Sequence, residues 1–361
     1  MTDTYTVLLQ PVGVEFEAED GETILDAAFR QGISLPHGCK EGQCSACKSI
    51  LLEGDIELKK HSTFALSETE RDADHILLCC SLAESDVEIE LLNFDEELLS
   101  KSIAVKEFAG AIAGIEKLTS DIRQVDIELE RPLKFWAGQY VEITVTTSQG
   151  QTITRSFSMA NSPLETEKLR FIIKKYPEGK FSNELDDGGI RIGAKVTVKG
   201  PYGSCFRREG RQGPVILVGA GSGMSPIWAI LNDHLASGED RDVHFFYGAR
   251  TRADLFYLDE ISGLTAANPR LKFIPVLSEA SDDADWTGEK GFVHEVVDAH
   301  LKLLDTDGNG DVYACGPPPM VDALMPVLFM HDFDGDRTFV DRFTVASQPD
   351  ELQQKLEAVS R

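Results

Sequence analysis

Closely spaced cysteines are the residues in this chain whose type and spacing most directly predict chemistry. Cys39, Cys44 and Cys47 form a C-x4-C-x2-C pattern, and the adjacent Cys79 and Cys80 follow further along the chain. The first residues are polar and acidic rather than a signal peptide, and no apolar run approaches the ~18 residues needed to span a bilayer. We therefore expect a cytoplasmic protein, in which seven cysteines indicate metal or redox chemistry rather than disulfides.

The segment from Pro36 to Cys47 resembles the cluster loop of plant-type ferredoxins. Small residues at positions 38, 42 and 46 let such a loop wrap inorganic atoms and turn backbone N–H groups toward the sulfurs. The resemblance implies a [2Fe-2S] cluster bound by Cys39, Cys44, Cys47 and one further cysteine. In ferredoxins the last ligand precedes a Ser-Asp pair by six residues, and Ser85-Asp86 then indicates Cys79, with Cys80 as a packing residue.

Zinc is the alternative for this site. Structural zinc sites usually use two C-x2-C motifs. Only one such motif is present here, and four residues separate it from the preceding Cys39. The flanking pattern favours the cluster. Strands are predicted over 4–10 and 14–17, and Thr23 and Asp26 predict a capped helix that Gly32 closes. This order resembles the ferredoxin β-grasp fold and defines a first domain over residues 1–98.

A short polar stretch at residues 99–102 predicts a linker, and residues 103–209 read as a small antiparallel β-barrel. Alternating apolar residues at 141, 143 and 145, and at 171 and 173, predict two of its strands. Two motifs lie inside this region. They are Arg155-Ser156-Phe157-Ser158, and Gly179-Lys180-Phe181-Ser182, which opens a predicted helix over 182–185.

Both motifs resemble those of ferredoxin–NAD(P)+ reductase-type flavoproteins. The resemblance implies that Arg155 pairs with the FAD pyrophosphate, that Phe157 lies along the flavin and that the Ser158 hydroxyl hydrogen-bonds the ring. It further implies that Ser156 belongs to the same contact strand, and that the turn of Gly179, Lys180, Phe181 and Ser182 holds the other side of the phosphates.

From residue 212 the pattern changes to alternating buried strands and helices, which predicts an α/β domain over 212–346. A strand over 215–218 is followed at once by Gly219, Gly221, Gly223 and Met224, and Pro226 suits a first helical turn. The glycines run G-x-G-x-G rather than G-x-G-x-x-G. A later strand over 311–314 ends in Cys315-Gly316-Pro317-Pro318.

These spacings resemble the reductase family's own G-x-G-x-G-x-[ST]-P and C-G-P-P motifs. The resemblance implies that the glycine turn with Met224 binds the NAD(P) pyrophosphate, and that Cys315, with Gly316 and Pro317, lies near nicotinamide C4. Arg250 would reach the adenosine, and the neighbouring Asp254 and Asp259 favour NADH over NADPH. In the last strand the resemblance implies a carboxylate near the hydride path at Asp341 and an aromatic on the flavin face at Phe343. Residues 347–361 form a polar tail without recognisable chemistry.

Nearly the whole chain therefore resembles the three-domain reductase components of bacterial multicomponent oxygenases. The expected fold is multi-domain: a β-grasp ferredoxin domain, an antiparallel FAD barrel and a parallel-sheet NAD domain. The nearest resemblance is to reductases of soluble di-iron monooxygenases of the methane, propane and alkene group; reductases of benzoate-type Rieske dioxygenases are the alternative. It implies an NADH-dependent oxidoreductase passing electrons through FAD and the cluster to an oxygenase component.

The distribution of acidic and basic side chains along the chain indicates which macromolecules it can bind. The chain has a net charge of −26, which argues against nucleic-acid binding, and residues 1–99 carry 22 acidic against 6 basic side chains. We expect this acidic domain to be steered toward a basic oxygenase surface. A redox sensor that uses the cluster as a signal is the rival interpretation, but a sensor has no need of its own flavin and nicotinamide motifs.

Overall fold

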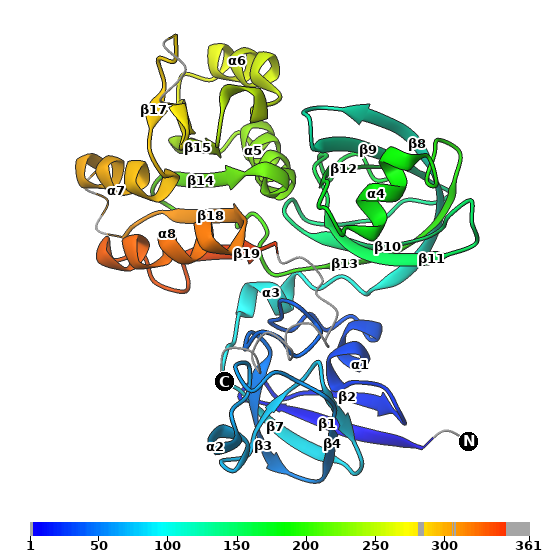
Figure 1. The fold of residues 1–361 in the computed structure, drawn as a ribbon. Coiled ribbons are helices and arrows are strands. Elements are labelled where there is room, and N and C mark those ends of the chain that lie inside the picture. The colour runs from blue at the N-terminus through cyan, green and yellow to red at the C-terminus, as the bar shows by residue number, and fades with distance from the viewer. Residues whose placement is uncertain (1–2, 281–284, 305, 307, 344–361) are drawn as a thin grey trace, which may run out of the picture.

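The computed structural model describes residues 3–280, 285–304, 306 and 308–343, and these fold into three units arranged in chain order (Figure 1). The predicted tail over 347–361 lies outside the described residues, as do residues 344–346. The three expected fold types are confirmed, and each has its own apolar core.

The first unit is a five-stranded sheet of order β2-β1-β7-β3-β5 with a short β4-β6 pair beside it. Strands β1 and β7 run parallel, while β1 and β2 form an antiparallel hairpin as predicted. Thr23 caps helix α1 by accepting the N–H of Asp26, and α1 buries its apolar side against the sheet. The elements are β1 (Thr4–Gln10), β2 (Val14–Glu19), α1 (Ile24–Arg30), β3 (Lys48–Glu53), β4 (Ile56–Leu58), α2 (Glu68–Arg71), β5 (His75–Leu77), β6 (Ser81–Ala83) and β7 (Val87–Leu91).

The connection to the second unit differs from the prediction, because the polar stretch at 99–102 begins inside a helix, α3 (Glu96–Ser100). Asp95 caps this helix by accepting the N–H of Leu98, at 2.9 Å. The predicted linker is therefore preceded by a capped helix with buried Leu98, which the sequence did not indicate.

The second unit is a six-stranded antiparallel sheet of order β11-β10-β13-β8-β9-β12. A bridge between Met159 and Phe171 joins its outer strands, so that the sheet curls into a barrel around an apolar core. Helix α4, predicted over 182–185, is longer than expected. The elements are β8 (Lys106–Lys117), β9 (Ile122–Leu129), β10 (Tyr140–Thr146), β11 (Thr152–Ser158), β12 (Lys168–Lys174), α4 (Lys180–Asp187) and β13 (Lys195–Tyr202).

The third unit is a parallel sheet of order β17-β16-β15-β14-β18-β19 with helices on both faces. Leu217 of β14 packs in one core with α5 and α6, whereas Ile216 and Val218 pack in another with α7 and α8. The elements are β14 (Val215–Ala220), η1 (Gly221–Gly223), α5 (Met224–Ser237), β15 (Val243–Ala249), η2 (Arg252–Asp254), α6 (Leu258–Ala267), β16 (Leu271–Leu277), β17 (Glu289–Lys290), α7 (Val293–Leu304), β18 (Asp311–Gly316), α8 (Pro318–Met330) and β19 (Thr338–Arg342).

Candidate electron-transfer site

The cysteines predicted as cluster ligands gather at one end of the first unit. Cys39 and Cys44 are partly exposed, while Cys47 and Cys79 are buried with their Sγ atoms 3.3 Å apart. The backbone N–H groups of Gln43 and Glu41 point at Cys39 Sγ from 3.2 and 3.4 Å, and that of Cys39 points at Cys44 Sγ from 3.4 Å. Backbone donors aimed at sulfur stabilise negative charge there, as an iron–sulfur cluster requires.

The four thiols share protons in two hydrogen-bonded pairs. Hydrogen bonding from Cys47 lowers the pKa of Cys79 to about 3, and hydrogen bonding from Cys39 lowers the pKa of Cys44 to about 6, while the same bonds raise the pKa values of Cys47 and Cys39 above the ordinary value. Thiolate is the form that binds iron. The described residues contain no group of three or more His, Cys, Asp or Glu side chains converging as they would around a single metal ion.

Cys80 packs against a neighbouring loop. Its Sγ lies 3.6 Å from Cys79 Sγ and donates to Lys60 O at 3.8 Å. Gly42 makes this close packing possible: its φ is +67°, and a Cβ there would lie 2.6 Å from Cys80 Sγ. The loop that contains the predicted ligands therefore has no room for a side chain at this position.

The two flavin motifs meet through their aromatic residues. Phe157 near the end of β11 contacts Phe181 of α4, with ring centroids 4.9 Å apart. Arg155 is partly exposed on the same strand, and its guanidinium donates to Thr154 O at 2.7 Å. No carboxylate in the described part of the chain forms an ion pair with Arg155, so its charge is available to an anion. Ser156 is exposed beside it, and Ser158 is buried.

The second flavin motif forms the start of α4. Gly179 precedes the first helical turn, and Ser182 Oγ donates back to Gly179 O at 3.2 Å. Lys180 is exposed while Phe181 is buried, so the motif presents one cation and free backbone N–H groups beside the strand that carries Arg155.

The glycine turn of the third unit lies against the end of β18. A Cβ on Gly223 would fall 2.1 Å from Cys315 O, so only glycine allows this approach. Gly219 ends the buried part of β14, Gly221 opens η1, and Met224 begins α5 fully buried. Arg250 is exposed just after β15. These residues lie at the carboxyl ends of adjacent parallel strands, where such sheets bind ligands.

Cys315 and Asp341 are opposite one another in the β18–β19 ladder. Cys315 is fully buried and its Sγ lies 3.8 Å from Cys205 Sγ, and burial raises its pKa. Burial also raises the pKa of Asp341 to about 6, with a further contribution from the negative charge of Cys44. Phe343 follows β19 and donates its N–H to Gly316 O at 2.9 Å, and Pro317 begins the turn into α8. Cys44 belongs to the loop of residues 36–47 in the first unit, which we call the cysteine loop. The end of β19 thus approaches this loop.

A contact between the cysteine loop and the barrel was not predicted from the sequence. The N–H of Gly203 donates to His37 Nε2 at 3.2 Å, and Lys40 Nζ pairs with Glu142 at 2.8 Å. Lys40 also lies over the Tyr202 ring, 3.6 Å from its centroid. Tyr140 stacks on Tyr202 and stands opposite Ser158 in the β10–β11 ladder. The loop is therefore held against the strand pair that carries the flavin motif.

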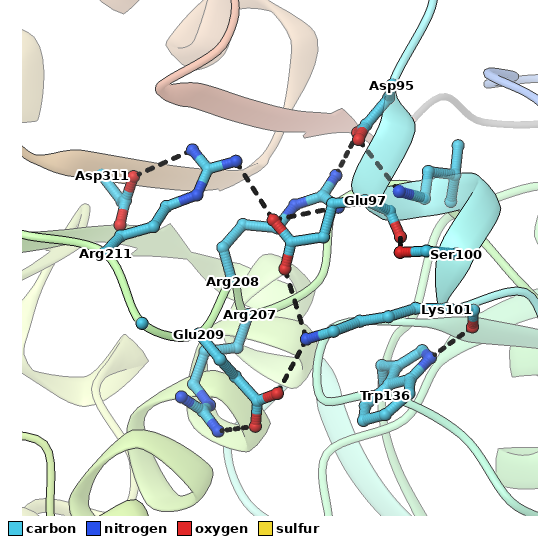
Figure 2. Close-up of polar contacts among 12 residues, drawn as sticks. Asp95, Glu97, Ser100, Lys101, Trp136, Arg207, Arg208, Glu209, Arg211 and Asp311 are labelled. Atoms are coloured by element: carbon cyan, nitrogen blue, oxygen red, sulfur yellow. Dashed lines mark hydrogen bonds and ion pairs between the residues drawn. The ribbon is translucent and has the colours of Figure 1, made fainter.

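Two further contacts join the units. Ser225 of α5 donates to Ser158 O at 2.6 Å, which ties the glycine-turn helix to the flavin strand. At the junction helix α3, Glu97 pairs with Arg211 and Lys101, and Arg211 also pairs with Asp311 (Figure 2). Ser158 and Ser225 belong to motifs, but neither motif indicates that they contact one another, and the sequence contains no local signal for the pairing of Glu97 with Arg211.

Comparison with known proteins agrees with this geometry. Three family models match: the 2Fe-2S iron-sulfur cluster binding domain over residues 7–84, the oxidoreductase FAD-binding domain over 110–206 and the oxidoreductase NAD-binding domain over 217–325. The reductase component of propane 2-monooxygenase from Gordonia sp. (strain TY-5) is 42% identical, covering 95% of this chain and 98% of the relative. The chain belongs to the reductase components of multicomponent oxygenases.

Other relatives of this reductase extend the same comparison. The reductase component DmpP of phenol 2-monooxygenase from Pseudomonas sp. (strain CF600) is 35% identical over 95% of this chain and 96% of its own length. The crystal structure of the Amycolatopsis cytochrome P450 reductase GcoB has a TM-score of 0.83 at 28% identity, covering 95% of this chain and 100% of that one. The ferredoxin reductase in carbazole 1,9a-dioxygenase has a TM-score of 0.74 at 29% identity, covering 95% and 99%.

This reductase is thus an NADH-oxidising flavoprotein with a [2Fe-2S] cluster, which confirms the predicted cofactors and enzyme class. Among the described residues no helix is long and apolar enough to cross a membrane.

Proposed function

We propose that this reductase supplies electrons from NADH to the oxygenase component of a di-iron monooxygenase in the cytoplasm. The proposal is supported chiefly by the contacts of the cysteine loop with Glu142 of β10 and with Gly203 after β13, because β10 pairs with β11, the strand that contains Arg155. Propane, phenol and xylene/toluene monooxygenase relatives support this class of partner, whereas carbazole 1,9a-dioxygenase represents the alternative class.

We infer the following roles for residues of the second and third units. FAD supplies the chemistry that accepts an electron pair from a nicotinamide and releases electrons singly. Arg155 binds its phosphates from one side, and the α4 turn of Gly179, Lys180, Phe181 and Ser182 binds them from the other. Phe157 lies along its ring, the Ser158 hydroxyl hydrogen-bonds the ring, and Ser156 belongs to the same strand. The turn of Gly219, Gly221, Gly223 and Met224 holds the nicotinamide dinucleotide pyrophosphate.

Around the nicotinamide, Cys315, Gly316 and Pro317 shape the floor of the site. Asp341 in β19 holds a carboxylate near the hydride path, and Phe343, just after β19, lies on the flavin face. Arg250 binds the adenosine side. Asp254 accepts the N–H and hydroxyl of Thr251 at 3.0 and 2.9 Å, which holds a carboxylate near Arg250 and disfavours the extra phosphate of NADPH. The cluster is bound by Cys39, Cys44, Cys47 and Cys79.

Reconstitution tests this function. The purified reductase is mixed with NADH and with di-iron hydroxylases and Rieske oxygenases in turn, and products from alkanes, alkenes and aromatics are measured against NADH consumed. We expect a di-iron hydroxylase to be driven with NADH preferred over NADPH. Coupling to a Rieske oxygenase alone, or bleaching of the visible spectrum by dithionite but never by NADH, would contradict the proposal.

A further inference from the structure

A cationic hollow lies beside the cluster loop in the otherwise acidic first unit. It measures about 350 Å³, and its lining includes the basic side chains of Lys59, Lys60 and Arg71, together with His61. Glu68 is the one carboxylate that lines it. Residues 1–99 contain only six lysines and arginines, so half of the basic side chains of the unit gather at this one place.

These three cations differ from the other three in forming no ion pair within the part of the chain that the structure describes. Arg30 pairs with Glu22, Lys40 with Glu142 and Lys48 with Glu70. Lys59, Lys60 and Arg71 are exposed, and none forms an ion pair with a carboxylate in the described ranges. Exposed like charges held together repel one another, so their gathering favours an anionic surface that would neutralise them.

A large aromatic side chain protrudes beside the hollow. Phe64 is 92% exposed, the highest value among the exposed large apolar side chains of the described residues. Its neighbour Thr63 lines the hollow, whereas the adjacent Ala65 is buried and anchors the loop. An exposed aromatic on an anchored loop, next to charged groups, is typical of an anchor residue in a protein–protein interface.

The hollow is connected to the cluster ligands through short contacts. The N–H of Lys59 donates to Cys80 O at 2.7 Å, and the N–H of Ser62 donates to Gly42 O at 2.9 Å. Cys80 is the chain neighbour of Cys79, and its Sγ packs against the Lys60 carbonyl. On the other side of the loop, His37 and Lys40 are covered by the barrel. A partner can therefore approach the cluster at the 59–64 loop without separating the units.

We propose that the hollow and Phe64 form the docking surface for the oxygenase component, whose complementary site presents carboxylates around an apolar notch. This docking proposal rests on the proposed function. It adds that the surface of the first unit that contacts the oxygenase is positively charged, although the net charge of the unit is negative. This departs from the expectation that the domain docks through its acidic side chains onto a basic surface.

The test uses the full-length, cofactor-loaded reductase and the oxygenase component that it drives in reconstitution. Binding of the two oxidised proteins is measured by titration calorimetry for wild type, Phe64→Ala and the Lys59→Glu/Lys60→Glu double variant. Phe329→Ala on α8, which is 81% exposed, and Lys195→Glu on the barrel are matched controls distant in sequence and fold. NADH-dependent reduction of ferricyanide and the visible spectrum check that flavin and cluster are intact.

We expect Phe64→Ala and the charge-reversal variant each to weaken binding roughly tenfold or more, with ferricyanide reduction and both controls unchanged. Equal binding by wild type and the surface variants would overturn the docking proposal while leaving the proposed function intact, as would tighter binding by the charge-reversal variant. If the wild-type reductase is reduced by NADH yet drives no oxygenase of either class, the proposed function is refuted and the docking proposal falls with it.

Discussion

Replacing Asp95 by asparagine tests how the junction helix α3 is held. Arg208 is 1% exposed, its guanidinium pairs with Asp95, and it lies over the Phe206 ring at 3.9 Å from the centroid (Figure 2). Asp95 has a second task, because its Oδ1 accepts the N–H of Leu98 and caps the helix. Asparagine caps helices as well as aspartate does, so Asp95→Asn removes the charge and retains the cap.

The magnitude follows from burial. Removing one partner of a buried ion pair costs about 3–5 kcal/mol, because the remaining charge is left without compensation. Asp95 is itself 29% exposed, and Glu97 remains 3.9 Å from Arg208, so solvent and the second carboxylate reduce the loss. We expect the local opening free energy of α3 to fall by about 2–3 kcal/mol in Asp95→Asn, and by about 1 kcal/mol more in Asp95→Ala, which also loses the cap.

Amide hydrogen exchange measures this opening directly, and it suits a three-domain chain whose global unfolding is not two-state. A loss of 2–3 kcal/mol corresponds to exchange faster by roughly 30- to 150-fold at Leu99 and Lys101, whose amides bond within the helix. Amides of β1 should not change. The Asp95→Asn/Arg208→Met double variant should recover most of the protection, because it removes both charges. Exchange in Asp95→Asn within threefold of wild type would refute the reasoning.

The remaining predictions concern the cofactors and pH. Gly42→Ala should lose bound iron, because the added Cβ would meet Cys80 Sγ. Gly13→Ala is the control: its φ of +64° is similar but its surroundings are open, so this variant should retain iron. Equal iron content in the two purified variants would show that crowding at Gly42 is unimportant. Arg155→Ala should release FAD on gel filtration while the cluster spectrum persists, and full FAD retention would remove Arg155 from the phosphate site. Burial lowers the pKa of His244, which bonds His300 at 2.8 Å, to about 4, below the ordinary 6.5. Between about pH 4 and 6.5 the unfolded chain therefore binds more protons at His244 than the folded chain does, and thermal stability should fall as the pH drops through this range. The fall should be less steep in His244→Asn. Parallel profiles of thermal stability against pH for wild type and variant would contradict this.

Much of the fold could be predicted because its signals are local. The Thr23 cap, the alternation along β10 and the continuous apolar run of β14 each follow from contacts within a few residues or from burial on one or both faces. The sequence did not predict α3, whose last residues overlap the polar stretch at 99–102. That helix is stabilised by the pairing of Glu97 with Arg211, which is more than a hundred residues away in the sequence.

In the candidate site, too, some features have local sequence signals and others depend on contacts between distant segments. Closely spaced motifs predict the cluster loop, the flavin strand and the glycine turn, since cofactor phosphates and sulfurs demand particular residues at short spacing. The contacts of His37 and Lys40 with Tyr140, Tyr202 and Gly203 join two units, and no spacing along the chain indicates them. Likewise, the sequence shows six basic residues in the first unit but not that three of them line one hollow.

By itself, the sequence determined which cofactors this reductase binds and the order of its domains, because those depend on residue types at short range. Only the tertiary structure decided how the units contact one another, which side of the cluster loop is covered, and that Lys59, Lys60 and Arg71 gather near Phe64. Such juxtapositions arise from packing between distant segments, and no local pattern of residues encodes them.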